Sequence, residues 1–238
     1  LPYGNMPDDN EHGDTYGPLN YLLYVPAAAV WHEPGDDVWQ DGLPAAHAVA
    51  TVSDLAACLL LAAIGWRWMS KRAALVLAAA WMTYPFTGWV LCNNVNDTLV
   101  AALVLASLLL LPKPGLRGAA MASAAAIKFM PLLAIPVLAH VGIARRGSQA
   151  WRVAVGAAVV LGACCVYLAA YPSGLSLFWH ATFGFQLDRS SPFSPWGLYG
   201  WQGAQRVAQV LLVAGLGIAA FLPARRDARQ VAAGVAAA

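Results

Sequence analysis

Long apolar runs separated by short polar segments make up most of the chain. Spanning a bilayer takes about 20 mostly apolar residues, and four runs come close to that length: residues 43–66, 73–91, 150–170 and 207–222. A fifth run, residues 98–111, is shorter and spans only if residues 93–97 begin the helix inside a wet, protein-lined cavity. The pattern therefore predicts an all-α, polytopic integral membrane protein with five transmembrane helices.

Basic residues mark one side of these helices. Short cytoplasmic loops carry an excess of Lys and Arg, and here such residues gather in three loops and the tail: Arg67, Lys71 and Arg72; Lys113 and Arg117; Arg145, Arg146 and Arg152; and Arg225, Arg226 and Arg229. Residues 1–41 contain eight acidic side chains and no Lys or Arg. We therefore expect an outer acidic loop at 1–42, a transmembrane domain at 43–222 and a cytoplasmic tail at 223–238.

This orientation requires one segment to fold back. Residues 118–143 would have both ends on the cytoplasmic side, which a single crossing cannot achieve. Pro131 and Pro136 interrupt the segment, and proline inside a helix removes a hydrogen bond and bends or breaks it. We therefore predict a re-entrant helical hairpin with Lys128 near its tip. Irregular backbone at membrane depth needs protein or a water-filled cavity around it, so the hairpin predicts a cavity.

Two further segments are expected at the outer interface. Residues 171–205 then lie outside and are rich in Phe, Trp and Tyr, which sit well at the level of the lipid headgroups. Residues 18–31 are apolar but too few to span, and we expect them to lie along the outer interface or dip into it.

The composition agrees with a membrane protein. Hydrophobic residues make up 60% of the 238 positions and charged residues 11%, against about 25% charged in an ordinary soluble domain. The formal net charge is only +2, without the clustered basic surface that nucleic-acid binding requires. Membrane lipids are therefore expected as partners, and nucleic acids are not.

Ionisable residues inside the membrane are functional candidates, since each costs about 2.5 to 3.5 kcal/mol at the centre of a helix. Lys128 lies too far from the charged loops to reach them easily. A bound anion would offset its cost, and so would an ion pair with Asp54 or Asp97. His47 and Asp54 are seven residues apart and share a helix face. This arrangement fits a proton relay, but polar contacts in helix packing are the favoured explanation.

Polar residues cluster at the outer end of the short fifth span: Asn93, Asn94, Asn96 and Asp97. One such residue is enough to cap a helix. Four within five positions favour further contacts to a hydroxyl-rich ligand.

Two outer segments carry other candidate ligands. Asp8, Asp9, Glu11 and His12 supply enough oxygen and imidazole groups for a divalent cation. Their spacing matches no EF-hand or zinc motif, so a solvated acidic loop is favoured, and the sequence shows no required cofactor. Arg189 is suited to hold a phosphate or carboxylate bidentately, although a surface pair with Asp188 fits as well.

Several short motifs, taken in order, carry a resemblance to a known family: residues 1–4, 16–18, 21–26, 94–97, 128–131 and 189–196. Together they resemble the bacterial membrane glycosyltransferases of family 87. That family has the GT-C fold and includes actinobacterial mannosyltransferases that depend on polyprenol phosphate. The resemblance covers nearly the whole chain.

The resemblance implies a hexosyltransferase of the cell envelope. Such an enzyme moves a sugar, mannose in the first instance, from a polyprenyl-phosphate carrier to a lipid or glycan hydroxyl on the outer face of the bacterial plasma membrane. Under this interpretation Lys128 and Arg189 stabilise the departing phosphate. The polar residues 93–97 contact substrate, with Asn93, Asn94 and Asn96 holding sugar hydroxyls.

The family's catalytic base is typically an Asp in the first outer loop, which by the resemblance would lie upstream of Leu1. That part is absent, so we expect an N-terminally truncated fragment that lacks the first transmembrane helix and the base. Asp14 is the nearest remaining candidate. The main alternative is a transporter or flippase for a lipid-linked or anionic substrate, because broken helices and midplane charges also mark transport sites.

Overall fold

The computed structural model describes residues 3, 15–31, 43–139, 146–185 and 194–221, and there it contains helices and no strand. The first half holds α1 (Pro18–Val30), α2 (Pro44–Trp68), α3 (Lys71–Thr83), α4 (Pro85–Cys92), α5 (Asp97–Leu109) and α6 (Pro114–Ala125). The second half holds η1 (Met130–Ala134), α7 (Ile135–Ala139), α8 (Arg146–Ala169), α9 (Gly174–Phe178), η2 (Trp179–Gly184), α11 (Pro195–Leu198) and α12 (Gln202–Phe221). The expected all-α fold is confirmed.

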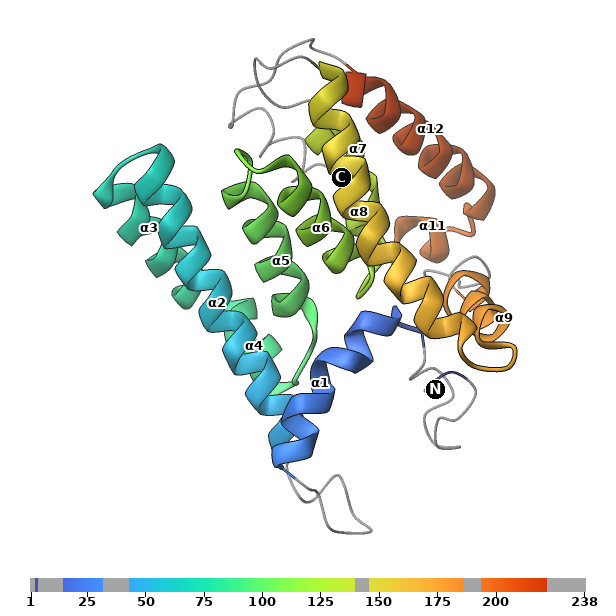
Figure 1. Ribbon diagram of the computed structural model, residues 1–238, viewed down its shortest axis with the longest axis horizontal. Helices are drawn as coiled ribbons and strands as arrows, with labels where there is room; N and C mark the ends of the chain where they lie inside the picture. Colours follow the sequence, from blue (N-terminus) through green and yellow to red (C-terminus); the bar gives the residue numbers. More distant parts are fainter. Residues whose placement is uncertain (1–2, 4–14, 32–42, 140–145, 186–193, 222–238) are drawn as a thin grey trace.

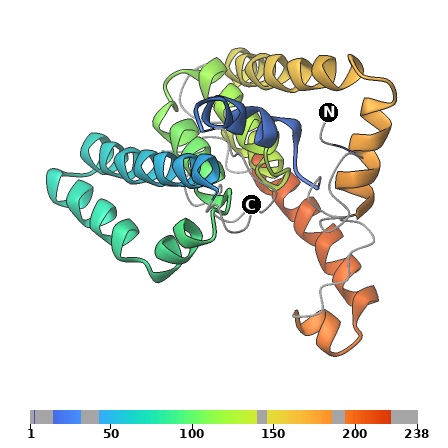
Figure 2. The same ribbon diagram turned by 90° about the horizontal axis from the view of Figure 1, so that it is seen from below.

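The helices α5 and α6 lie in the middle of the molecule. In both views α2, α3 and α4 lie on one side of them, and α8 and α12 lie on the other (Figures 1 and 2).

Among the residues that the structure describes, two helices are each long and apolar enough to cross a membrane: α2, and α8 over Gln149–Ala169. They match the spans expected at 43–66 and 150–170. At about 1.5 Å per residue, the 25 residues of α2 exceed the hydrocarbon thickness of a bilayer, about 30 Å. Both helices also carry apolar side chains that face outward, since Val52, Leu59, Val159 and Val166 are each about two-thirds exposed or more. Such surfaces are suited to lipid.

The prediction of a single helix spanning residues 73–91 is wrong. The chain breaks between α3 and α4, whose axes are bent by 52°. Tyr84 lies at the break in an extended conformation, with φ −69° and ψ 124°. The cause is Pro85, because the proline ring disfavours helical geometry in the residue before it. The two pieces together form a broken span or a re-entrant loop.

Two other expected spans appear as helices whose crossing of the membrane stays a prediction. At 13 residues, α5 is about 20 Å long, which is short of a bilayer. The helix α12 covers residues 207–221 of the expected run 207–222 but begins earlier, at Gln202.

The segment 171–205, expected as an outer loop, is largely helical in its described residues. It contains α9, the π-helix η2, α11 and the start of α12. Helical turns pair backbone groups that would otherwise be costly at an apolar interface. The Ser194 hydroxyl adds a cap by accepting a hydrogen bond from the Gly197 amide at 3.2 Å.

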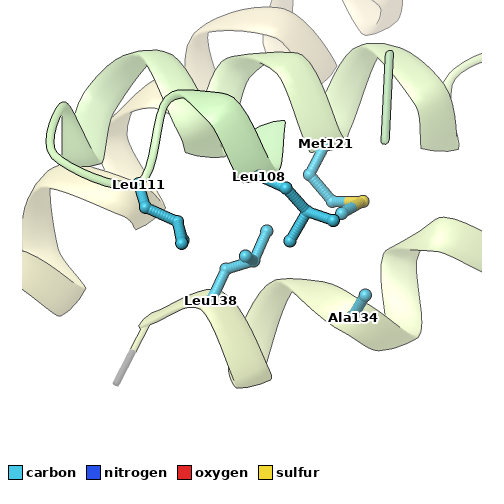
Figure 3. Packing of buried hydrophobic residues seen from close by; sticks show 5 residues of the cluster. All are labelled: Leu108, Leu111, Met121, Ala134 and Leu138. Atoms are coloured by element: carbon cyan, nitrogen blue, oxygen red, sulfur yellow. The ribbon is translucent and has the colours of Figure 1, made fainter. Parts of the chain in front are cut away.

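The hairpin expected around Lys128 is present in the fold. The chain turns after α6 and returns through the 3₁₀-helix η1 and α7, so that Ala134 and Leu138 of the second arm pack against Met121 of the first (Figure 3). Leu108 of α5 and Leu111, just past the end of that helix, complete this core. Residues 140–143 of the expected hairpin lie outside the described residues, and whether the hairpin enters a membrane, and from which side, stays a prediction.

The first arm of the hairpin begins at Pro114 rather than at residue 118, since proline is favoured in the first turn of a helix. Arg117 therefore lies in the first turn of α6, just past the loop that it was expected to mark, and the side of the membrane on which that loop lies stays a prediction. Arg117 is 1% exposed, and its guanidinium donates to the Leu111 carbonyl and, at 3.1 Å, to the Gln149 side chain.

Glycines let the first arm of the hairpin, α6, pack closely against α8. A Cβ on Gly118 would lie 2.2 Å from the Val153 carbonyl oxygen, and one on Gly156 would lie 1.9 Å from that of Gly115. Small residues at helix interfaces allow such close backbone approach in membranes. This contact fixes the hairpin, and with it Lys128, against a membrane-length helix.

Candidate functional site

Polar side chains of residues 94–97, at the start of α5, contact three other parts of the chain: the start of α2, the start of α1 and the turn after α6. We call this set the polar cluster: Tyr16, Asn20, His47, Asn94, Asn96, Asp97 and Lys128. The hairpin turn and the start of α5 supply its charged groups.

Lys128 forms an ion pair with Asp97. The two side chains are 28% and 52% exposed, so water reaches both. The Lys128 ammonium also lies 5.5 Å from the ring centre of Tyr16, within reach of a cation–π attraction. Of the two carboxylates that the sequence left open as partners, Asp97 is the one that the structure brings to Lys128.

The segment before α1 is docked on the hairpin turn, which explains the position of Tyr16. The Gly17 amide donates to the Ile127 carbonyl at 2.9 Å, and the Leu19 amide donates to the Ala126 carbonyl at 3.2 Å. A Cβ on Gly17 would lie 2.0 Å from the Ala126 carbonyl oxygen, so only glycine permits this approach. Burial raises the pKa of Tyr24 above its usual value of 10, and the nearby Tyr16 makes a smaller contribution in the same direction.

Asn96 links α5 to α1. Its side-chain amide donates to the side-chain oxygen Oδ1 of Asn20 at 2.7 Å, and both residues are buried. Asn96 is the N-cap residue of α5, yet its side chain makes no capping hydrogen bond. Its Oδ1 and the hydroxyl of Thr98 are buried and have no hydrogen-bond partner among the described residues. Buried polar atoms are normally paired, so these two mark unused hydrogen-bonding capacity at the start of α5, which a ligand would reach only if the neighbouring side chains moved.

The other two asparagines have different partners. Asn94 adopts a left-handed backbone with φ +52°, and its Oδ1 accepts from Nδ1 of His47 at 2.8 Å. Asn93 donates to the Trp89 carbonyl at 2.8 Å and thereby ends α4. The residues expected as substrate contacts therefore divide into one that ends a helix and three that belong to the polar cluster.

His47 and Asp54 do not share a partner in the described part of the chain. Asp54 is 2% exposed and accepts the indole N–H of Trp81 at 2.8 Å, which joins α2 to α3. This contact agrees with the packing role that the sequence favoured for Asp54. His47 is exposed and contacts Asn94 instead.

Aromatic rings form a connected group beside the polar cluster. Phe183 of η2 lies 5.4 Å from Phe129, 5.8 Å from Phe178 and 5.0 Å from Trp179, measured between ring centres. Tyr3 extends the group to Phe178 at 5.4 Å. Phe129 follows Lys128 directly in the chain, so this aromatic cluster lies next to the cation. A cation beside an apolar surface is suited to an amphipathic ligand.

Several candidate residues lie outside the described residues. These are Asp14, Arg189 and the suggested cation ligands Asp8, Asp9, Glu11 and His12. Leu1, upstream of which the resemblance placed the family's catalytic base, also lies outside them, so the position of that base stays a prediction. Within the described ranges, no group of three or more His, Cys, Asp or Glu side chains could hold a metal ion.

The sequence pattern did not identify Tyr16 and Asn20 as residues of the site. Tyr16 stands in a motif that carries the family resemblance, which was the available signal. Asn20 lies in an apolar run and gives no local signal.

The comparison with protein families gives a match over most of the chain. The model of glycosyltransferase family 87 matches residues 15–238, which include the whole polar cluster. No curated protein and no solved structure matches the chain. The family match favours a transferase over the transporter or flippase considered above. The chain therefore belongs to glycosyltransferase family 87 and, with its membrane-length helices, is a membrane glycosyltransferase.

Proposed function

We propose that the protein transfers a hexose, mannose in the first instance, from a polyprenyl-phosphate carrier to a hydroxyl of a lipid or glycan. We place the reaction at the outer face of the bacterial plasma membrane, on a GT-C fold. The observation that carries the proposal is the position of Lys128. It is a partly exposed cation at a hairpin tip, beside buried polar atoms and an aromatic cluster.

The chemistry defines what the site must supply. The acceptor oxygen forms a bond to the anomeric carbon, and the bond from that carbon to the phosphate oxygen breaks. The electron pair of that bond leaves with the polyprenyl phosphate, and the proton of the hydroxyl passes to a carboxylate. A fixed cation near the phosphate stabilises the charge that develops there. We assign that role to Lys128, with Arg189 as the second cation and Asp14 as the candidate base.

The ion pair with Asp97 is compatible with this role. Exposed or half-exposed pairs contribute only about 0 to 1 kcal/mol, and Asp97 is half exposed. A phosphate can therefore replace Asp97 as the partner of Lys128 at little cost. Asp97 would meanwhile hold the ammonium at the hairpin tip before the donor arrives.

The neighbouring groups are suited to the rest of the donor. Oδ1 of Asn96 and the hydroxyl of Thr98 are unpaired polar atoms next to Asp97, and sugar hydroxyls are natural partners for them. The rings of Phe129 and Phe183 offer an apolar surface for the first isoprene units.

The donor class is tested with the full-length protein in vesicles. Radiolabelled mannose is supplied either on a polyprenyl phosphate or on a nucleotide, and transfer to the membrane fraction is measured. We expect transfer only from the polyprenyl-phosphate donor. Transfer from the nucleotide sugar alone would overturn the proposal. Glucose on the same carrier then measures the preference for mannose.

The outward placement of the site is a separate prediction. In a variant without the four native cysteines, single cysteines are placed at Pro112 and Gly147, on either side of the hairpin, and at His47 and Tyr199. We expect the first two to react with an impermeant thiol reagent only from the cytoplasmic side, and the last two only from outside. Opposite sides for Pro112 and Gly147 would mean that the hairpin segment crosses the membrane once.

Asn94 provides a test of substrate contact. Glycine adopts the left-handed backbone of this position without strain, so Asn94→Gly should keep the thermal midpoint nearly unchanged. Loss of one hydrogen bond to the sugar, worth about 1.5 kcal/mol at most, should reduce kcat/KM about 10-fold. Asn93→Ala is the matched control and should leave kcat/KM unchanged. A parallel loss of folded protein and activity in Asn94→Gly would make the residue structural.

A further inference from the structure

A cavity of about 630 Å³ lies at the other end of α2 from the polar cluster. Its walls are apolar and come from Ala62 and Ala63 of α2 and from Leu109 and Leu110 at the end of α5. Two cationic side chains, Arg67 and Lys113, also line it. The cavity thus combines an apolar interior with a pair of positive charges.

This cavity is separate from the proposed transferase site. His47 lies in the polar cluster and Arg67 lines the cavity, 20 residues further along the same helix. At 1.5 Å per residue this is about 30 Å, close to the hydrocarbon thickness of a bilayer. The two sites therefore lie at opposite ends of a membrane-length helix.

The two cations of the cavity have no carboxylate facing them among the described residues. In those ranges the acidic residues are Asp54, which accepts from Trp81, and Asp97, which pairs with Lys128. Both belong to other parts of the fold. Further cations lie at the same end, since Lys71 stands 5.3 Å from the Trp66 ring. A ligand that fits must be anionic at one end and apolar at the other.

We propose that this cavity binds an anionic phospholipid of the bilayer. Its phosphate lies between Arg67 and Lys113, and an acyl chain lies along Leu109, Leu110 and the alanines of α2. Basic pockets between membrane helices bind acidic headgroups on the cytoplasmic side, and short basic loops also mark that side. Trp66 borders the cavity and is exposed, as is usual for tryptophan at the interface.

Purified full-length protein in a neutral detergent provides the test. Binding is followed by native mass spectrometry and by the thermal midpoint, with phosphatidylglycerol and phosphatidylcholine of identical acyl chains as probes. We expect phosphatidylglycerol to bind and to raise the midpoint, and phosphatidylcholine to do neither. The double variant Arg67→Gln, Lys113→Gln should bind phosphatidylglycerol about 30-fold more weakly, at about 1 kcal/mol for each cation.

Two matched variants separate the cavity from general surface charge. Arg72→Gln removes an exposed cation at the same end that does not line the cavity, and it should change the affinity less than threefold. Ala63→Trp fills the cavity and keeps both cations, and it should abolish binding. The proposal fails if both lipids bind equally or if Arg72→Gln weakens binding as much as the double variant. It also fails if glycerol phosphate without acyl chains binds as tightly as the lipid.

Discussion

Replacing Lys128 by Met should reduce the donor affinity of the transferase about 30-fold or more, because loss of a hydrogen-bonded charge pair commonly costs 2 to 5 kcal/mol. The fold should survive the change. The pair with Asp97 is partly exposed, so its removal costs at most about 1 kcal/mol, and water hydrates the carboxylate that remains. Full-length Lys128→Met should therefore lose donor affinity while its thermal midpoint stays nearly unchanged.

Two further variants make this result specific. Lys128→Arg keeps the charge at the hairpin tip and should retain much of the donor affinity. Lys71→Met removes an exposed lysine at the far end of α2 and should leave donor affinity unchanged. A collapsed midpoint with normal donor affinity in Lys128→Met would mean that the ion pair is structural, and the phosphate assignment would be wrong.

The hairpin was predictable because two independent constraints agreed. The charge distribution required both ends of the segment on one side, and Pro131 and Pro136 could not lie inside one straight helix. The same reasoning placed Lys128 at the turn. The long helices α2 and α8 were predictable for a simpler reason, since their apolar runs exceed the length that a bilayer requires.

Other features depend on contacts that the pattern of residues does not reveal. Arg117 looked like a loop marker because it follows Lys113 and two prolines. Its burial depends on the Leu111 carbonyl and on Gln149, which lies 32 residues away. The break before Pro85 is different, because its cause is local. The long apolar run around it concealed the break.

The charged and amide residues of the site were predictable from the sequence. The residues that they contact were less so. Four polar residues at the start of a short apolar helix attract attention in any sequence. The choice of Asp97 over Asp54 could not be made, because both lie at plausible depths. Asn20 and Tyr16 enter the site only because the chain before α1 lies directly on the turn after α6. That contact depends on one glycine.

Gly17→Ala should therefore impair the site strongly. The backbone of Gly17, with φ −69° and ψ 160°, is one that alanine adopts readily, so the substitution creates no backbone strain. The added methyl group would lie 2.0 Å from the Ala126 carbonyl oxygen, and the two segments must move apart. A misplacement of about 1 Å can cost about 100-fold in rate, and we expect a loss of that order in kcat/KM.

The accompanying loss of stability should be modest, because overpacking typically costs about 1 to 3 kcal/mol. Gly88→Ala is the matched control, since a Cβ there meets no atom within 4 Å, and it should leave activity unchanged. Tyr16→Phe keeps the ring over Lys128 and should also be active, whereas Tyr16→Ala should reproduce part of the Gly17→Ala defect. Full activity in Gly17→Ala at a normal thermal midpoint would show that docking of this segment is not needed. The polar cluster would then have to work through α5 and the hairpin turn alone.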